Sequence, residues 1–482
     1  MHINLVPLPN EFHTDYKLFF RKSIFENTSV EYDSKYSAEG YSIVIDEKGA
    51  KVRCSNKAGE NFAYQTLKQL EYNYSGNIPY ITIEDKPAFS YRGFMIDCAR
   101  HFFSVEDLKK MIDAACLFKF NKFHWHLVDD QGWRMEIKKY PLLTEKGSVR
   151  THSNFGRYYN PNPHTGYYTV SQMKDIVEYC KKKSIDVIPE IEIPGHASAC
   201  IHAYPHLSCN QSVIPVRTHA GIFKDILCAG NEKVYEFIFN VLDEMAAIFT
   251  SEYVHIGGDE APKDRWDKCP LCQKKMKELG LTDAEQLQGY MLNRVFSYLN
   301  KKGKKAITWN ESLRGDNLEK GITVQNWREK NDECLLRASS GGKIIVSDFF
   351  HYYTDYPLGM TPLKKTYEYN PIKETLEESY RKNIIGVETP IWTEFIDNIE
   401  KMSTMCYPRF AAVSETGWTL KKNKNYDDFS IRLKKVLPMI EKYGLSYADS
   451  YEWDPGFFKS AKQIIKFAYN MYNKETIKSR KE

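Results

Sequence analysis

The segment that decides the fold begins with Arg92-Gly-Phe-Met-Ile-Asp97 and ends with Lys122-Phe-His-Trp-His-Leu127. Between these two apolar runs, Ser104 precedes a segment whose apolar residues recur every three or four positions from Leu108 to Ala115. Ser is a favoured helix N-cap, and this spacing places the apolar side chains on one helix face. A strand–helix–strand unit of this kind predicts a parallel sheet covered by helices.

The same alternation of apolar strands and amphipathic helices continues along the chain. Strands are predicted at 92–97, 122–127, 185–190, 253–258, 305–309, 322–326, 343–347 and 384–391. Four of the helices between them are predicted to start at the capping residues Ser104, Thr169, Asn231 and Thr282. Eight strand–helix repeats predict an α/β fold, the (β/α)8 or TIM barrel. A doubly wound open sheet is the alternative, but no glycine-rich fingerprint follows the first strand.

Residues 1–86 have a different pattern and are predicted to form a small α+β domain before the barrel. Strands are expected at 41–46, 50–54 and 78–83, and a helix is expected at 61–70. The sequence Asp85-Lys-Pro87 marks the boundary. The barrel and its C-terminal helices are therefore expected to occupy residues 87–482.

The composition of the 482-residue chain is that of an ordinary globular protein, with 42% hydrophobic and 27% charged residues. Its formal charge of +4 is small and its Lys and Arg are scattered, so no nucleic-acid partner is expected. No run approaches ~18 uninterrupted apolar residues, so no membrane partner is expected either. The N-terminus lacks the features of a signal peptide, which favours a cytoplasmic location, although a secreted chain trimmed of its signal would look the same.

The eleven cysteines are odd in number and irregularly spaced, which favours reduced thiols inside a cell. Cys269-Pro-Leu-Cys272 has the spacing of half a zinc site. A structural zinc site needs four ligands, and no second pair follows at zinc-ribbon spacing. The sequence therefore predicts no metal site at this pair.

Every predicted strand is followed by ionisable or aromatic residues, and in a (β/α)8 barrel these strand ends carry the chemistry. In strand order they are Asp97 and Arg100; His124, His126, Asp129 and Asp130; Glu190, Glu192 and His196; His255, Asp259 and Glu260; Trp309, Asn310 and Glu311; Trp327; His351, Tyr352, Tyr353 and Asp355; and Trp392 and Glu394. Indoles cover the apolar face of a pyranose, while Arg and carboxylates bond to its hydroxyls. The set therefore indicates a sugar-binding cup.

Asp259 and Glu260 are the strongest candidates for catalysis in this cup. Glycoside hydrolysis needs a carboxylic acid to protonate the leaving oxygen and usually a second carboxylate. Neighbouring residues in strand geometry point in opposite directions, so this pair is not expected to flank a glycosidic bond in the ordinary way. A structural ion pair is the alternative. The preceding Gly257-Gly258 favours catalysis because it lets other groups approach the backbone closely.

Several motifs carry a resemblance to the β-N-acetylhexosaminidases of glycoside hydrolase family 20, over about residues 3 to 420. They are Arg92-Gly-Phe-Met-Ile-Asp-Cys-Ala-Arg-His-Phe102, Lys119-Phe-Asn-Lys-Phe-His-Trp-His-Leu-Val-Asp-Asp-Gln-Gly-Trp-Arg134, Pro189-Glu-Ile-Glu-Ile-Pro-Gly-His196, His255-Ile-Gly-Gly-Asp-Glu260, Trp309-Asn-Glu311, Val324-Gln-Asn-Trp327, Ile391-Trp-Thr-Glu394 and Tyr407-Pro-Arg409. Their number and their order along the chain make the resemblance specific.

The resemblance implies an exo-β-N-acetylhexosaminidase that removes terminal GlcNAc or GalNAc from the non-reducing ends of glycans. In such enzymes the substrate's own acetamide oxygen attacks the anomeric carbon, and the stereochemistry is retained. The resemblance implies that Glu260 protonates the leaving oxygen and then activates water. It also implies that Asp259 orients the acetamide N–H and that Tyr353 bonds to the acetamide oxygen.

The remaining site residues implied by the resemblance bind the sugar or position the catalytic acid. Trp309, Trp327 and Trp392 match the indoles around the acetyl methyl and the sugar ring. Arg100, Asp355 and Glu394 match residues that hold the sugar hydroxyls. His196 and Asp129 match a pair that positions and tunes the acid. No cofactor or metal is expected; the expected partner is the terminal N-acetylhexosamine of an oligosaccharide or glycoconjugate, bound by a monomer or homodimer.

The sequence also allows other functions and a metal site. The chain could be an inactive sugar-binding protein, which would lack the acid or its neighbour, or a glycosidase with an enzyme nucleophile. His124, His126 and His196 could form a zinc set, since imidazole is a favoured ligand. Arg92 and Asp97 are expected to form structural ion pairs near the barrel floor. The choice between GlcNAc and GalNAc, the aglycone, and release of one sugar or two are not readable from the sequence.

Overall fold

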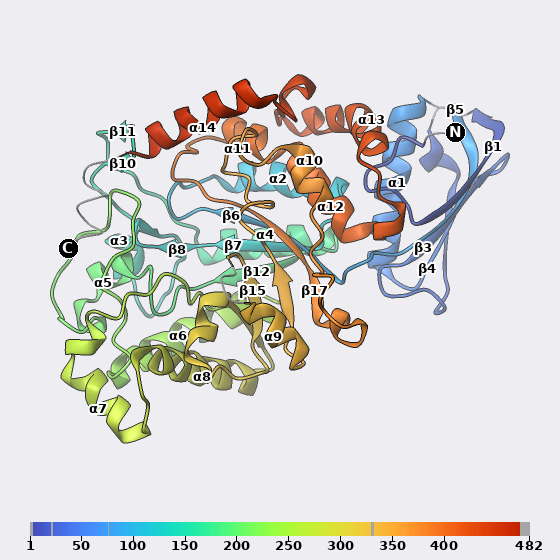
Figure 1. Cartoon of the computed structure of the whole chain (residues 1–482). Coiled ribbons are helices and arrows are strands. Elements are labelled where there is room, and N and C mark those ends of the chain that lie inside the picture. The colour runs from blue at the N-terminus through green and yellow to red at the C-terminus, as the bar shows by residue number, and fades with distance from the viewer. Residues whose placement is uncertain (1–2, 21–22, 76, 329–331, 473–482) are drawn as a thin grey trace.

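A closed barrel of eight parallel strands forms the centre of the protein (Figure 1). The computed structural model describes residues 3–20, 23–75, 77–328 and 332–472. Around the barrel the strands are β6 (Tyr91–Asp97), β7 (Lys122–His126), β12 (Asp186–Glu190), β13 (Tyr253–His255), β14 (Lys305–Trp309), β15 (Thr323–Asn326), β16 (Ile344–Val346) and β17 (Ile384–Ile391). Parallel pairing of β17 with β6 closes the ring. The predicted (β/α)8 barrel is confirmed.

Seven barrel strands lie within one residue of their predicted bounds, but the fourth is shorter than predicted. That strand, expected to run to residue 258, ends at His255. Gly257 and Gly258 have φ values of 64° and 110°, which lie outside the strand region. The chain therefore leaves the sheet before the acidic pair.

Helices cover the outside of the barrel. They include α2 (Val105–Leu117), α4 (Val170–Lys182), α6 (Glu232–Ile248), α8 (Ala284–Lys301), α9 (Glu333–Ser339), α10 (Leu363–Glu368), α11 (Ile399–Cys406), α12 (Arg409–Trp418) and α13 (Tyr426–Val436). Ser104, Thr169 and Asn231 cap α2, α4 and α6 as predicted. The fourth predicted cap was wrong by one residue, because Asp283 rather than Thr282 accepts the amide of Gln286. A carboxylate is favoured at this positive helix end.

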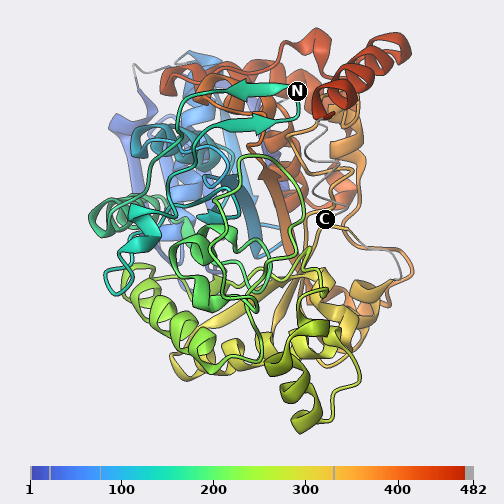
Figure 2. The same ribbon diagram turned by 90° about the vertical axis from the view of Figure 1, so that its left-hand side faces the viewer.

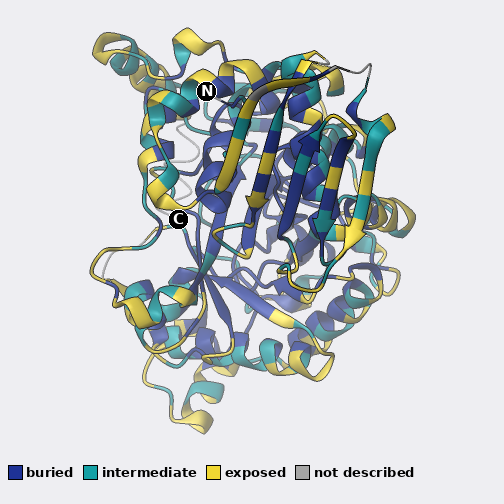
Figure 3. Ribbon diagram, turned by 90° about the vertical axis from the view of Figure 1, so that its right-hand side faces the viewer, coloured by how far each residue is buried: buried dark blue, intermediate teal, exposed yellow. Residues whose placement is uncertain are grey.

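The N-terminal residues form a five-stranded sheet in the order β1-β5-β3-β4-β2. Its elements are β1 (Glu11–Phe20), β2 (Thr28–Tyr32), β3 (Tyr41–Asp46), β4 (Gly49–Cys54), α1 (Lys57–Tyr74) and β5 (Asn77–Asp85). The sequence predicted the three central strands and the helix but not β1 and β2. These are edge strands with many exposed residues (Figure 3), so they lack the apolar alternation that marks a half-buried strand.

Asp85 ties this sheet to the barrel. Its Oδ2 accepts hydrogen bonds from Tyr41 Oη at 2.7 Å and from Trp418 Nε1 at 2.9 Å, and it lies 3.4 Å from Lys119 Nζ. Burial lowers the pKa of Lys119 to about 8, against the opposing effect of Asp85. The carboxylate therefore supports a buried ammonium at the junction of the sheet, α2 and α12.

Replacing Asp85 by Ala is expected to reduce the free energy of unfolding by about 3–5 kcal/mol, because it leaves the Lys119 ammonium buried without its counter-charge. Chemical denaturation at neutral pH measures the change. The matched control is Glu84→Ala, which removes an exposed carboxylate next to Asp85 on β5 and should cost less than about 0.5 kcal/mol. Equal losses of unfolding free energy in the two variants would contradict the role of Asp85 as the counter-charge of Lys119.

Short elements stand over the carboxyl ends of the barrel strands, on the face toward the viewer in Figure 2. They are the sheets β8 (Val128–Asp129) with β9 (Gly132–Trp133) and β10 (Ser153–Phe155) with β11 (Tyr158–Asn160), and the helices α3 (Leu142–Glu145), α5 (Ser198–Ala203) and α7 (Pro270–Leu279). The last described helix, α14 (Phe457–Met471), lies on the surface and buries none of its residues. Within the described ranges, no helix has both the length and the apolar character to span a membrane.

Candidate active site

Asp259 and Glu260 lie on the loop after β13, and both face the imidazole of His196. The Nε2 atom of His196 is 3.7 Å from Asp259 Oδ2 and 3.7 Å from Glu260 Oε2. The expectation that the two side chains diverge as in a strand is wrong. The strand has already ended, and Glu260 itself has a φ of 42°, so strand alternation does not apply.

Close packing explains why glycines precede the pair. A Cβ built on Gly257 would lie 2.1 Å from Glu192 Oε2, and one built on Gly258 would lie 2.2 Å from Ser312 Oγ. Only glycine combines this close approach with a positive φ at low cost. The two glycines therefore turn the chain so that both carboxyl groups reach one imidazole.

The surroundings raise the pKa of both carboxyl groups. Burial raises the pKa of Asp259 to about 7; His196 opposes this rise and Glu260 adds to it. Burial also raises the pKa of Glu260, again against His196. The side chain of Glu260 is 32% exposed and that of Asp259 is 12% exposed. Glu260 is therefore better placed to exchange a proton with a leaving group or with water.

His196 is held from its other side by two more carboxylates. Its Nδ1 lies 3.2 Å from Asp129 Oδ1 and 3.0 Å from Asp130 Oδ2. Burial opposes the charge on the ring, but Asp129, Asp130 and Asp259 together raise the pKa of His196 well above its ordinary value. The imidazolium form is therefore favoured. Asp130 was predicted among the strand-end residues of the cup but was given no catalytic or binding role; its position next to Asp129 after the second strand was the visible signal.

Arg100 connects Asp129 to the opposite side of the cup. Its Nη2 lies 2.8 Å from Asp129 Oδ2 and 4.0 Å from Glu394 Oε1. Its guanidinium stands 4.9 Å from the ring centroid of Trp392. Burial opposes ionisation of Asp129, but Arg100 and His196 hold its pKa below the ordinary value. Arg100 thus has carboxylates on two sides and an indole face beneath it.

Tyr353, Trp327 and Trp392 form a continuous aromatic wall. The Tyr353 ring centroid is 6.3 Å from that of Trp327, with the rings stacked at 20°, and 6.2 Å from that of Trp392. Trp309 lies beneath this wall, 1% exposed, and its Nε1 donates to Glu190 Oε1 at 2.9 Å. The structure thus brings three predicted aromatic residues to the wall and gives Trp309 a supporting position 6.2 Å from Trp392.

Asp355 and Glu394 are two further predicted carboxyl groups at this end of the barrel. Burial raises the pKa of Asp355 to about 8, and Glu394 adds to the rise. Burial also raises the pKa of Glu394, against the effect of Arg100. Among the described residues, Asp355 Oδ1, Asp259 Oδ1 and Trp327 Nε1 are buried polar atoms without a hydrogen-bond partner. Such atoms are costly unless a ligand satisfies them.

A buried carboxylate–imidazole network lies below the cup. Glu190 faces His124 Nε2 at 3.1 Å and His255 Nδ1 at 2.7 Å, and it also bonds to His126. His124, His126 and His196 belong to three different groups of potential ligand atoms, two of which share Glu190, and no group contains two of these three histidines. The alternative in which these three histidines share a zinc ion is therefore not supported.

Arg92 and Asp97 occupy opposite ends of β6. Arg92 lies at the floor, where its Nη1 is 2.7 Å from Glu39 Oε2 in the N-terminal domain. Asp97 lies at the carboxyl end, where its Oδ2 accepts the Thr393 amide at 3.0 Å and is 3.4 Å from Arg100 Nη1. The expectation that both lie near the floor was wrong for Asp97, because a seven-residue strand spans the barrel.

Cys269 and Cys272, for which the sequence showed no second pair of ligands, have two further cysteines beside them in the structure. The sulfurs of Cys209, Cys228, Cys269 and Cys272 all lie within 4.8 Å of one another. Cys209 and Cys228 precede β13 and are 19 positions apart, so they do not form the local pair that a zinc-ribbon pattern requires. Folding brings them to the start of α7.

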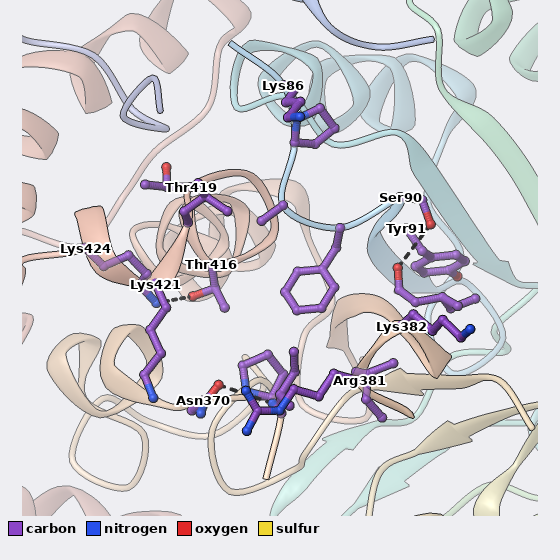
Figure 4. Close-up of a pocket in the computed structure, with 18 of the residues that line it drawn as sticks. Lys86, Ser90, Tyr91, Asn370, Arg381, Lys382, Thr416, Thr419, Lys421 and Lys424 are labelled. Atoms are coloured by element: carbon purple, nitrogen blue, oxygen red, sulfur yellow. Dashed lines mark hydrogen bonds between the residues drawn. The ribbon is translucent and has the colours of Figure 1, made fainter. Parts of the chain in front are cut away.

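A large hollow lies at the other end of the barrel, at the amino ends of the strands (Figure 4). Its volume is about 1870 Å³, and its lining includes Tyr91, Lys122, Tyr253 and Ile384, the first residues of four barrel strands. Lys86, Arg381, Lys382, Lys421 and Lys424 also line it. The chemistry of barrels of this kind lies at the carboxyl ends of the strands, so size alone does not identify the site.

The chain is similar to several β-hexosaminidases. It is 39% identical to that of Porphyromonas gingivalis over 442 residues, which cover 87% of this chain and 56% of the relative. It is 35% identical to that of Vibrio furnissii, over 79% of this chain and 65% of the relative. The chain thus spans less than two thirds of the length of these two relatives. With that of Akkermansia muciniphila the identity is 33%, over 82% of each.

Solved structures and family models agree with these similarities. An exo-β-N-acetylglucosaminidase from Vibrio harveyi, solved with N-acetylglucosamine, superposes with a TM-score of 0.84 at 30% identity, covering 93% of this chain and 78% of that one. The model of the glycosyl hydrolase family 20 catalytic domain matches residues 89–421, and that of the family's domain 2 matches residues 2–86. The chain belongs to glycosyl hydrolase family 20.

Proposed function

We propose that the protein is an exo-β-N-acetylhexosaminidase that hydrolyses terminal non-reducing GlcNAc or GalNAc by substrate-assisted, retaining catalysis. The observation that carries the proposal is the shared contact of Asp259 and Glu260 with His196 Nε2, at 3.7 Å each. Two carboxyl groups on the same imidazole lie on one side of the cup, whereas a two-carboxylate mechanism needs them on opposite sides of the scissile bond. This arrangement leaves the role of nucleophile to another group, and the resemblance to family 20 assigns it to the substrate's acetamide oxygen.

We assign the roles of Glu260 and Asp259 from the exposure of their side chains and from the buried oxygen of Asp259 that has no hydrogen-bond partner. Glu260, the more exposed acid, donates a proton to the leaving oxygen and then accepts one from water. The partnerless Oδ1 of Asp259 is available to accept the acetamide N–H and to stabilise its developing positive charge. By the resemblance, Tyr353 bonds to the acetamide oxygen, and Trp309, Trp327 and Trp392 enclose the acetyl methyl group and the sugar ring. Intramolecular attack by a held amide gains the usual advantage of a positioned reactant.

A panel of p-nitrophenyl glycosides tests the function. The N-acetylglucosaminide and N-acetylgalactosaminide should be cleaved, and the plain glucoside should not. A thiazoline mimic of the cyclised intermediate should inhibit competitively. A glucoside cleaved as fast as its N-acetylated counterpart would favour an enzyme nucleophile, and failure to cleave any member would favour an inactive sugar-binding protein.

Replacing His196 by Gln is expected to shift the acidic limb of the kcat/KM–pH profile to higher pH. His196 lowers the pKa of Asp259, so without the imidazolium that pKa rises above about 7 and less Asp259 is ionised at neutral pH. The profile should be measured with an N-acetylated aryl glycoside. His13→Gln replaces an exposed histidine on β1 of the N-terminal sheet; it is the control and should leave the limb unchanged. If the acidic limb of the His196 variant does not shift, His196 does not lower the pKa of Asp259.

We further propose that the substrate is the terminal sugar of an oligosaccharide or glycoconjugate and that the chain acts as a monomer or homodimer in the cytoplasm. The odd number of cysteines in a long chain supports a reducing compartment. Exposed apolar side chains on α14, such as Phe458 and Ile465, offer a surface that a second copy could cover. Light scattering of the purified protein and cell fractionation test these two points.

A further inference from the structure

Four cysteine sulfurs converge beside the catalytic face, outside the cup. Cys209 and Cys228 come from the long loop between α5 and α6, and Cys269 and Cys272 come from the start of α7. The Sγ atoms of Cys228 and Cys272 are 3.6 Å apart, those of Cys228 and Cys269 are 3.7 Å apart, and those of Cys209 and Cys272 are 3.8 Å apart. Three of the four residues are buried.

These separations match the edges of a zinc tetrahedron. With Zn–S bonds of about 2.3 Å, the sulfurs of a regular four-cysteine site lie about 3.8 Å from one another. Sulfurs joined in a disulfide lie only about 2.05 Å apart, and all four cysteines are free thiols in the structure. Four soft thiolate ligands in this arrangement select Zn²⁺ among the common divalent ions. We propose that Cys209, Cys228, Cys269 and Cys272 bind one structural zinc ion.

Two backbone segments that carry the cysteines pack closely against each other at Gly230 and Leu271. A Cβ on Gly230 would lie 2.2 Å from the carbonyl carbon of Leu271, so only glycine lets the two segments meet. Cys269 is the N-cap of α7, whose positive end favours a thiolate. A helix start next to a ligand stabilises the thiolate form that binds a metal.

The zinc ion would join two loops that shape the cup. The loop before α6 contacts the site directly, since the Arg217 amide donates to the Asp130 carbonyl at 3.0 Å. The segment with Cys269 and Cys272 follows Glu260 on the loop after β13, and Trp266 Nε1 already bonds to the Leu227 carbonyl at 2.9 Å. The proposed zinc ion is therefore a structural cross-link between the two loops and takes no part in catalysis. Binding replaces the four S–H bonds with Zn–S bonds and releases the protons to solvent.

Metal analysis of the purified full chain tests the proposal without any activity assay. Protein prepared with a non-thiol reductant and freed of loosely held metal should contain about one zinc per chain. Cys228→Ala and Cys272→Ala should each reduce that content to near zero. Cys180→Ala removes a buried thiol on α4 that is not part of the cluster, and this variant should retain the metal. Circular dichroism verifies that each variant is folded.

A second measurement covers the case in which the cluster variants do not fold. Wild-type protein stripped with a chelator and titrated with Co²⁺ should develop thiolate-to-cobalt charge-transfer bands that zinc abolishes, and zinc should protect the four cysteines from alkylation. Zinc retained by the Cys272→Ala variant, absence of the cobalt bands, or recovery of Cys209–Cys272 disulfide peptides from protein alkylated at harvest would overturn the proposal.

Discussion

Replacing Glu260 by Gln is expected to reduce kcat for oligosaccharide substrates by about 10²–10⁴-fold, the range that general acid catalysis contributes. The amide cannot donate a proton to a poor alkoxide leaving group. A dinitrophenyl N-acetylglucosaminide leaves with little protonation, so its cleavage should suffer far less. Rates on the two substrates, measured at one pH, give the ratio that identifies the acid.

The pH profile of the same variant offers an independent measurement. Glu260 must be protonated to act as the acid, so wild-type activity should fall as pH rises through its raised pKa. Gln cannot titrate, so the alkaline limb should disappear in the variant. Glu278→Gln, an exposed acid on α7, is the control and should change neither quantity. Equal losses on both leaving groups would show that Glu260 is not the proton donor.

Replacing Asp259 by Asn is expected to reduce kcat by about 10²–10³-fold, the cost of losing one preorganised electrostatic contact to the transition state. The neutral amide cannot stabilise the positive charge that develops on the substrate's acetamide. The loss should appear mainly in kcat rather than in KM, because the charge develops only as the reaction proceeds. An aryl N-acetylglucosaminide assayed at pH 8, where Asp259 of the wild type is largely ionised, measures it.

Stability separates this catalytic role from a structural one. The pKa of Asp259 is raised to about 7 in the folded protein, so the group stabilises the fold fully only below its ordinary pKa, and this contribution is lost as pH rises to about 7. Asp259→Asn should therefore be at least as stable as the wild type at pH 8. Asp264→Asn, farther along the same loop, is the control for both the kcat and the stability measurements. A marked loss of stability at pH 8 would indicate that Asp259 holds the fold together.

Much of the fold was predictable because it depends on local periodicity. The strand–helix unit from Arg92 to Leu127 repeats its pattern along the chain, and each barrel strand is a short apolar run buried on both sides. The strand ends are fixed once the strands are known, so the cup residues could be named in advance. The edge strands β1 and β2 were missed because exposed edges carry no such periodicity.

The amino-acid sequence by itself determined the order of strands and helices and the kinds of side chain at the strand ends, since these depend on neighbours along the chain. Only the tertiary structure decided that Asp259 and Glu260 share His196, that Asp130 joins them, that Trp309 lies beneath the wall and that four distant cysteines meet. Each of these depends on backbone turns at positive φ or on contacts between loops far apart in sequence, for which local patterns carry no signal.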